Sequence, residues 1–137
     1  MAAQPPIQVG DVFYLRCTLC NPPKPKFFVV AALDPLRMFL INSRLNEFQA
    51  SVPEIAACMV LIRATEHVDF LTHDSYVGCN QLSHEYNFAK LSELLVNHPD
   101  TRVGALHPHA KEAVSRALAG NTQLSGKYLR HVRPHWP

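Results

Sequence analysis

The sequence contains no apolar run that approaches the about 18 to 20 residues needed for a membrane-spanning helix. Its first residues, MAAQPPIQ, lack the basic and apolar parts of a secretory signal. Strong basicity is missing too, since the formal net charge is only +2, far from that of a dedicated binder of duplex nucleic acid. We therefore expect a cytoplasmic protein that has no membrane among its partners.

The cysteines do not form the two close pairs that a structural zinc site usually brings. Cys17 and Cys20 are close in sequence, but Cys58 and Cys79 lie too far apart to supply a second local pair. In a reducing compartment we expect buried free thiols, no disulfide framework and no cofactor. A zinc site in which Cys58, Cys79 or His84 joins the first pair remains the alternative.

The first part of the chain has the patterns of short strands. Residues GDVFYLRC alternate between two faces, as in a half-buried strand. The apolar runs FFVVAAL and LRMFLINS are separated only by an Asp-Pro pair that favours a tight turn, so they predict a hairpin. The CNPPKPK segment before them predicts a loop, because its prolines cannot donate ladder hydrogen bonds. Further strands are expected at ACMVLIRA, VDFL and SYVGC.

Beyond Asn80 the apolar period changes to that of helices. Apolar residues from Phe88 to Leu95 form one stripe, with Asn87 as N-cap and Pro99 as the stop. A second stripe over AKEAVSRALAG follows Pro108, and a last helical piece covers residues 127–132. Strands first and helices later predict one α+β domain over residues 1–137, with a barrel over about 8–79 and a helical part over about 80–133.

The predicted hairpin brings cationic and hydroxyl side chains together. Residues at equal distances from a tight turn lie opposite each other, so Lys26 should face Ser43 or its next neighbours. Such a group can hold a phosphate through charge-assisted hydrogen bonds, although strand ends are also commonly just polar and solvated. The expected patch comprises Lys24, Lys26, Asn42, Ser43 and Arg44.

A second polar group lies in HVDFLTHDSYVGC, between two strand-like pieces. His73, Asp74, Ser75 and Tyr76 follow one another there, and we expect them to form one wall of a polar cleft. A histidine titrates near neutral pH, so His73 suits general acid or base catalysis. The alternative is structural: Asp74 caps backbone donors in a turn, and Tyr76 fills the barrel.

The motifs GDVFYL, KPKFFVV, MFLINS and HDSYVGC make roughly the first 80 residues resemble the PemK/MazF family of toxins, which are SH3-like barrels. The resemblance implies a small SH3-like β-barrel of five to seven short strands with the C-terminal helices packed on it. In that family an Arg-Pro pair opens the second strand, a Thr or Ser closes the third, and the two cleave single-stranded RNA without a metal. Here Lys24-Pro25 and Ser43 occupy these places, so a lysine replaces the bidentate arginine.

The resemblance implies the toxin component of a type II toxin-antitoxin system, with a cognate antitoxin protein, single-stranded RNA and a homodimeric state as further expectations. Lys24 and Lys26 would neutralise phosphate, Ser43 would hydrogen-bond it, and His73 would act as base or acid. Asn42, Arg44, Asp74, Ser75 and Tyr76 would bind substrate, with Tyr76 stacking a base. Two alternatives remain: a catalytically silent SH3-like module that binds nucleic acid or protein, and a zinc-stabilised interaction domain.

Overall fold

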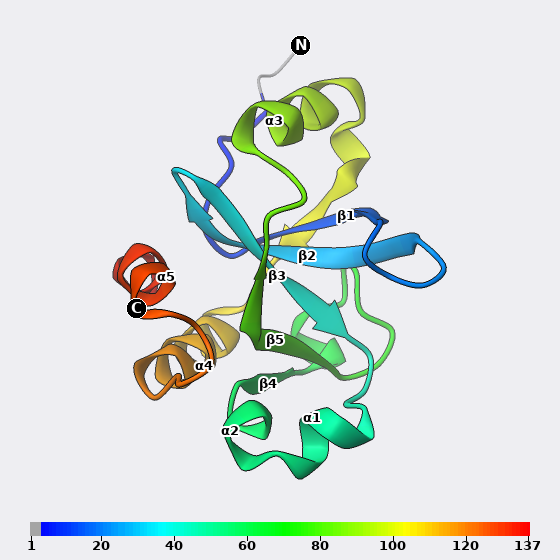
Figure 1. Cartoon of the computed structure of the whole chain (residues 1–137). Coiled ribbons are helices and arrows are strands. Elements are labelled where there is room, and N and C mark those ends of the chain that lie inside the picture. Colours follow the sequence, from blue (N-terminus) through cyan, green and yellow to red (C-terminus); the bar gives the residue numbers. More distant parts are fainter. Residues whose placement is uncertain (1–3) are drawn as a thin grey trace.

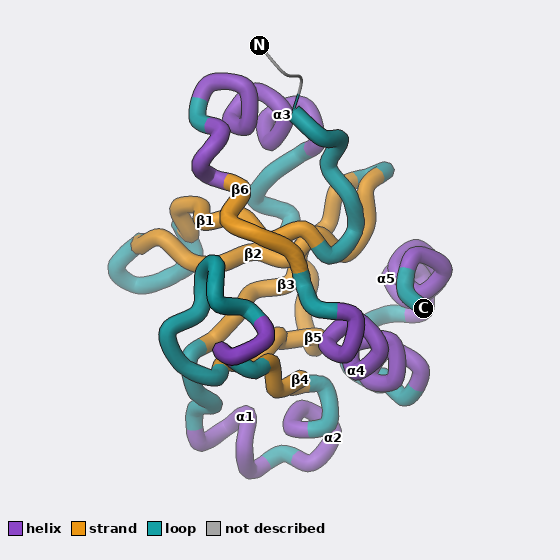
Figure 2. The backbone as a smooth tube through the Cα atoms, turned by 180° about the vertical axis from the view of Figure 1, so that it is seen from behind, coloured by secondary structure: helices purple, strands orange, loops and turns teal. Residues whose placement is uncertain are grey.

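The computed structural model of the protein describes residues 4–137 and shows an α+β fold around one six-stranded antiparallel sheet (Figure 1). The strand order is β4-β5-β3-β2-β1-β6, and the sheet curls into a half-barrel. Figure 2, from behind, shows β6 beside β1 at one edge of this sheet. The strands are β1 (Asp11–Cys17), β2 (Lys24–Leu33), β3 (Leu36–Asn42), β4 (Met59–Ile62), β5 (Ser75–Ser83) and β6 (Arg102–Ala105).

The helices lie around the sheet in three groups (Figure 1). Two short ones, α1 (Glu47–Ser51) and α2 (Pro53–Ala56), follow β3, whereas α3 (Phe88–Asn97) lies at the opposite end of the molecule. Near the C-terminus, α4 (Pro108–Ala119) and α5 (Gly126–Val132) lie beside each other. Within residues 4–137, no helix has the length and apolarity to cross a membrane.

Local sequence signals explain where these helices begin. The side chain of Asn87 accepts a hydrogen bond from the backbone of Lys90, so it caps α3 as expected. Pro108 stands in the first turn of α4, and Gly120 follows the last residue of that helix. The helices predicted from Phe88 to Leu95, over AKEAVSRALAG after Pro108, and over residues 127–132 are confirmed as α3, α4 and α5.

Each face of the sheet packs on its own apolar core, because alternate residues of a strand point to opposite sides. Val12 and Val29 belong to a core that includes Val114 of α4, whereas Phe13 and Phe28 belong to a second core. Leu91 and Leu95 of α3 complete that second core. Both faces of the sheet are apolar, so helices have to cover both of them. Residues of β2 and β3 belong to both cores, which hold the β2–β3 hairpin in place.

Several parts of the secondary structure differ from the expectations. VDFL forms a turn and no strand, because Phe70 and Leu71 donate their backbone hydrogens to the carbonyl of His67 in a helix-like turn. β2 starts at Lys24, so the second half of CNPPKPK belongs to a strand, and residues 47–56 form α1 and α2. β5 continues past residue 79, and β6 lies within the range expected to be helical.

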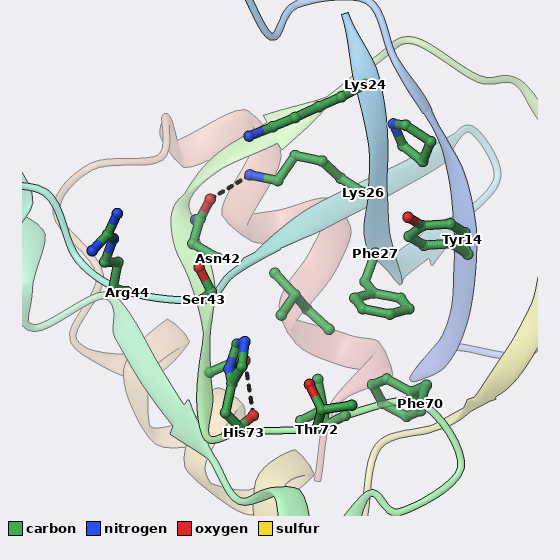
Figure 3. Close-up of a pocket in the computed structure, with 14 residues that line it drawn as sticks. Tyr14, Lys24, Lys26, Phe27, Asn42, Ser43, Arg44, Phe70, Thr72 and His73 are labelled. Carbon is green, nitrogen blue, oxygen red and sulfur yellow. Dashed lines mark hydrogen bonds between the residues drawn. The ribbon is translucent and has the colours of Figure 1, made fainter.

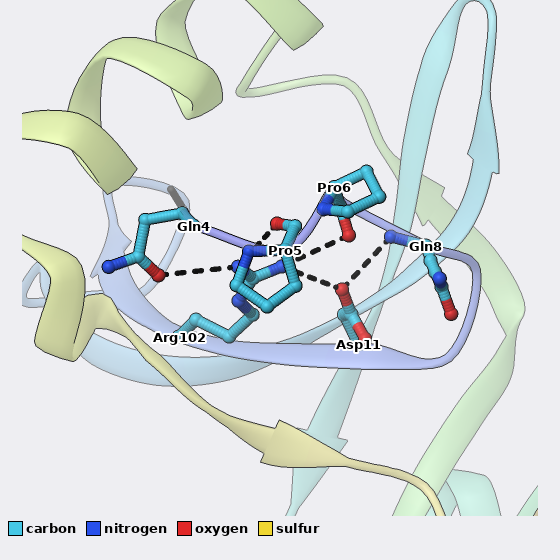
Figure 4. A network of polar contacts seen from close by, with 6 residues as sticks. All are labelled: Gln4, Pro5, Pro6, Gln8, Asp11 and Arg102. Atoms are coloured by element: carbon cyan, nitrogen blue, oxygen red, sulfur yellow. Dashed lines mark hydrogen bonds and ion pairs between the residues drawn. The ribbon is translucent and has the colours of Figure 1, made fainter. Parts of the chain in front are cut away.

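Arg102 joins the N-terminal segment to both β1 and β6 (Figure 4). Its guanidinium lies 3.2 Å from Asp11 Oδ2 and donates to the carbonyl oxygens of Pro5, at 2.7 Å, and Pro6, at 3.3 Å. The same Asp11 oxygen accepts the backbone hydrogen of Gln8. This network anchors the N-terminal segment, since β6 pairs with β1 over only a few residues.

We expect Arg102→Ala to lower the free energy of unfolding by about 2 to 3 kcal/mol, because it leaves a nearly buried carboxylate without its cation. The side chains of Arg102 and Asp11 are only 13% and 14% exposed. Urea unfolding followed by circular dichroism measures the loss. Arg102→Lys is the matched control and should recover part of it, and a loss below about 0.5 kcal/mol for Arg102→Ala would contradict the assigned role.

Candidate functional site

A cleft with a volume of about 380 Å³ opens where the β2–β3 hairpin ends, opposite the segment that leads into β5 (Figure 3). One bank comes from the hairpin and carries the cationic side chains, and the other comes from residues 70–73 and 75. Tyr14 of β1 closes one side. The predicted site residues that line the cleft are Lys24, Lys26, Asn42, Ser43, Arg44, His73 and Ser75.

The register of the hairpin places the cationic bank. Phe28 pairs with Leu40, so continued alternation sets Lys26 opposite Asn42, the neighbour of Ser43. Lys26 Nζ donates to Asn42 Oδ1 at 2.6 Å, which holds the ammonium group at the mouth of the cleft. Ser43 and Arg44 follow directly after β3 and are exposed. The sequence prediction that Lys26 faces Ser43 or a next neighbour is confirmed.

His73 forms the facing bank, and its imidazole points toward Ser43 in Figure 3. Its Nδ1 lies 3.2 Å from the backbone carbonyl oxygen of Asp74 and 3.4 Å from Ser75 Oγ. A proton on Nδ1 that is donated to this carbonyl leaves the other ring nitrogen, Nε2, as a proton acceptor. Ser75 is only 2% exposed and donates its hydroxyl hydrogen to the His73 carbonyl. Ser75 therefore positions the His73 segment.

Two further predicted residues do not line the cleft. The carboxylate of Asp74 accepts the backbone hydrogen of Ala64 at 2.9 Å, so Asp74 ties the segment before β5 to the 3-10 helix that follows β4. Tyr76 is half-buried in β5, directly opposite Asn42 on β3, and packs against the core. The structural alternative that the sequence offered for both residues matches these contacts.

An aromatic wall completes the cleft. Tyr14 and Phe27 are paired across β1 and β2, and their ring centroids are 4.9 Å apart. Phe70 continues the row, at 5.4 Å from Phe27. Gly104 of β6 lets this ring approach, since a Cβ atom there would lie 2.9 Å from Phe70 Cδ1. Tyr14 is 46% exposed, so a ring of the wall is open to a ligand.

Sequence reasoning missed this aromatic wall. In GDVFYLRC, Tyr14 and Arg16 lie on one strand face together with the buried Val12, and both are exposed. These two long side chains with polar tips were the available signal, because they had to meet either solvent or a ligand. Phe70 gave no such signal, since the turn that carries it was expected to be a strand.

The cysteines of residues 4–137 lie outside the group of three possible metal ligands that the structure brings close together. Cys17, Cys58 and Cys79 are buried. Burial raises the pKa of Cys58 and of Cys79, so both remain thiols. Burial, helped by a hydrogen bond with Cys17, also raises the pKa of Cys20 beside the cationic bank. Within residues 4–137, the groups of three possible metal ligands that lie close together include no cysteine.

The charges that line the cleft are all positive. Lys24, Lys26 and Arg44 carry them, and no aspartate or glutamate is among the lining residues. No protein-family model matches the chain, and no curated protein is significantly similar to it. The chemistry of the cleft is thus the main evidence on function: it suits a polyanion with flat, stackable groups.

Proposed function

We propose that the protein is a metal-independent endoribonuclease that cleaves single-stranded RNA, and that it is a PemK/MazF-like toxin with an SH3-like barrel. The observation that carries this proposal is the meeting of Lys24, Lys26, Ser43 and His73 around one cleft. These residues come from two segments separated by about thirty positions in sequence. The resemblance to the PemK/MazF family adds support, since it matches Ser43 and the Lys24-Pro25 pair to that family's catalytic residues.

The lining of the cleft favours single-stranded RNA over a duplex. A single strand can turn its bases outward and stack them on aromatic rings, whereas bases within a duplex are already stacked. Tyr14 and Phe27 offer such rings in the same cleft as the Lys24 and Lys26 ammonium groups. A nucleotide can therefore place its phosphate on the cationic bank while its base meets the aromatic wall.

The cleavage uses the ribose as its own nucleophile. His73 takes the proton of the 2′-hydroxyl, and the 2′-oxygen attacks the adjacent phosphorus. The bond from phosphorus to the 5′-oxygen breaks, and that oxygen receives a proton from the Lys24 ammonium. The Lys26 ammonium and the Ser43 hydroxyl hydrogen-bond the phosphoryl oxygens, where negative charge accumulates. The products are a 2′,3′-cyclic phosphate and a 5′-hydroxyl.

One observation favours a second candidate, a module that binds RNA without cutting it. The ammonium group of Lys26 already donates to Asn42, and the family arginine is replaced by Lys24. A lysine offers a point charge in place of a planar fork, so it holds a transition-state phosphate with less geometric control. Such a module would keep the affinity of the cleft and lose the chemistry.

The partners follow from the same proposal. A toxin of this type is held inactive by a cognate antitoxin whose disordered segment folds over the active cleft. An acidic and aromatic segment would suit a cleft with three cations and an exposed tyrosine. A homodimer is a further part of the proposal, carried by the resemblance alone.

The test is an assay with a fluorescently labelled single-stranded RNA in buffer that contains EDTA. We expect the untagged wild-type chain to release fragments with 2′,3′-cyclic phosphate ends, and a DNA oligonucleotide of the same sequence to stay intact because it lacks the nucleophile. Tight RNA binding without cleavage would support the binding module instead. Absence of both binding and cleavage would refute both functions.

A further inference from the structure

Three side chains outside the cleft converge between η1 (Ala64–Glu66) and the start of α4. Glu66 Oε2 lies 2.8 Å from His109 Nδ1 and 3.6 Å from His107 Nδ1. One donor atom from each of the three residues lies within 4.8 Å of the other two. His107 and His109 flank Pro108 at the first turn of the helix, 41 and 43 positions after Glu66 in sequence.

His67 holds the two segments together before any ligand binds. It is 3% exposed, and its Nδ1 lies 2.7 Å from the carbonyl oxygen of Arg63. Its Nε2 accepts the backbone hydrogen of His107 at 3.0 Å, so His67 is a neutral imidazole with its proton on Nδ1. The backbone of His107 is therefore fixed against η1, and the three donor side chains start from a rigid frame.

Two imidazoles and one carboxylate are a ligand set that divalent first-row transition metals accept. Zinc binds His nitrogen and Glu oxygen at about 2.0 to 2.2 Å and often leaves a fourth position to water. The cluster is partly exposed, with Glu66 and His107 half-buried and His109 open to solvent, so water can reach that position. Side-chain rotations can bring three donor atoms that start within 4.8 Å of one another around one ion.

Two interactions oppose metal binding at this cluster. The binding free energy of the metal must exceed their combined cost. His107 Nδ1 accepts the backbone hydrogen of His109 at 3.1 Å, which caps α4, and an ion at this nitrogen displaces that bond. The positive end of the helix dipole also disfavours a cation there. Each effect is worth about 1 kcal/mol, well below the binding free energy of zinc with its usual ligands.

We propose that Glu66, His107 and His109 bind a divalent first-row transition-metal ion such as Zn²⁺, with water completing the coordination. The ion ties η1 to α4 and takes no part in RNA cleavage in the cleft. The site stands apart from the proposed nuclease function, because the three ligands are absent from the cleft lining.

Zinc binding by the full, untagged chain tests the site. The protein is stripped with EDTA, dialysed and titrated with Zn²⁺ in a calorimeter, and its thermal midpoint is followed in parallel. We expect one Zn²⁺ per chain and a rise in the midpoint that EDTA reverses. His109→Ala and Glu66→Gln should each weaken Zn²⁺ binding at least about tenfold. His98→Ala, at an exposed histidine outside the cluster, is the matched control and should bind as the wild type does.

The choice of variants distinguishes a loss of zinc binding from a loss of folding. His109 is largely exposed, so its alanine variant should retain the wild-type circular dichroism spectrum and lose only the zinc-dependent rise in midpoint. Full Zn²⁺ affinity in both His109→Ala and Glu66→Gln would overturn the site. Loss of binding in Cys17→Ser or Cys20→Ser, with retention in His109→Ala, would overturn it too and move the metal to the cysteines.

Discussion

His73→Ala should lower kcat for the cleavage of single-stranded RNA by about 10²- to 10⁴-fold, the usual contribution of a positioned general base. The side chain is exposed on its own bank of the cleft and lies away from both cores, so the variant should fold normally. Initial rates with a fluorescent RNA give kcat and KM, and fluorescence anisotropy gives the affinity. We expect the affinity for RNA to stay within about threefold of the wild type, because the cations remain in place.

Tyr14→Ala provides the matched contrast for this experiment. Removing the exposed ring takes away about 1 to 3 kcal/mol of base stacking, so KM should rise with a smaller effect on kcat. The two variants therefore distinguish the contribution of the His73 imidazole to kcat from the contribution of the aromatic wall to KM. Cleavage by His73→Ala at the wild-type rate would rule out the assigned base, and an unchanged KM in Tyr14→Ala would remove the aromatic wall from substrate binding.

Trp136→Ala should lower the free energy of unfolding by about 3 to 5 kcal/mol, in the range measured for large buried aromatic side chains. The indole is only 7% exposed and lies with its ring centroid 6.2 Å from that of Phe39. Its Nε1 also donates to the carbonyl oxygen of Ala31, at 3.1 Å. Ala31 stands at the irregularity of the β2–β3 ladder, between Val30 and Ala32, so the indole satisfies a carbonyl that the bulge leaves without a strand partner.

Trp136→Phe separates these two contributions. The phenyl ring keeps most of the packing and loses the hydrogen bond, so we expect a loss of about 1 to 2 kcal/mol, mostly for the unsatisfied carbonyl of Ala31. Chemical unfolding of the three proteins, monitored by circular dichroism, compares them. If Trp136→Ala unfolds at the wild-type denaturant concentration, the C-terminal segment does not anchor the sheet.

Much of the fold and half of the cleft follow from local sequence signals. The hairpin could be predicted because two apolar runs flank a single turn signal, and its register then fixed Lys26 beside Asn42. The helices α3 and α4 carry their own start signals, the Asn87 cap and Pro108 in the first turn. Short-range patterns therefore determined which side chains gather on the cationic bank.

The rest depended on contacts between distant segments. β6 is only four residues long and owes its strand form to pairing with β1, so no pattern within the strand announces it. The meeting of Glu66 with His109 likewise requires α4 to dock beside η1. For Asp74, the sequence offered both a site and a cap, and only the bond to Ala64 distinguishes them.

The origin of the two banks has a consequence for the order of folding. The cationic bank comes from one hairpin whose contacts are close in sequence, so it can assemble early at a small cost in loop-closure entropy. The bank that carries His73 reaches its place only when the start of β5 pairs with the C-terminal end of β3. Under the proposed function, a nascent or partly unfolded chain would bind RNA before it could cleave it, and cleavage would show that the sheet is complete.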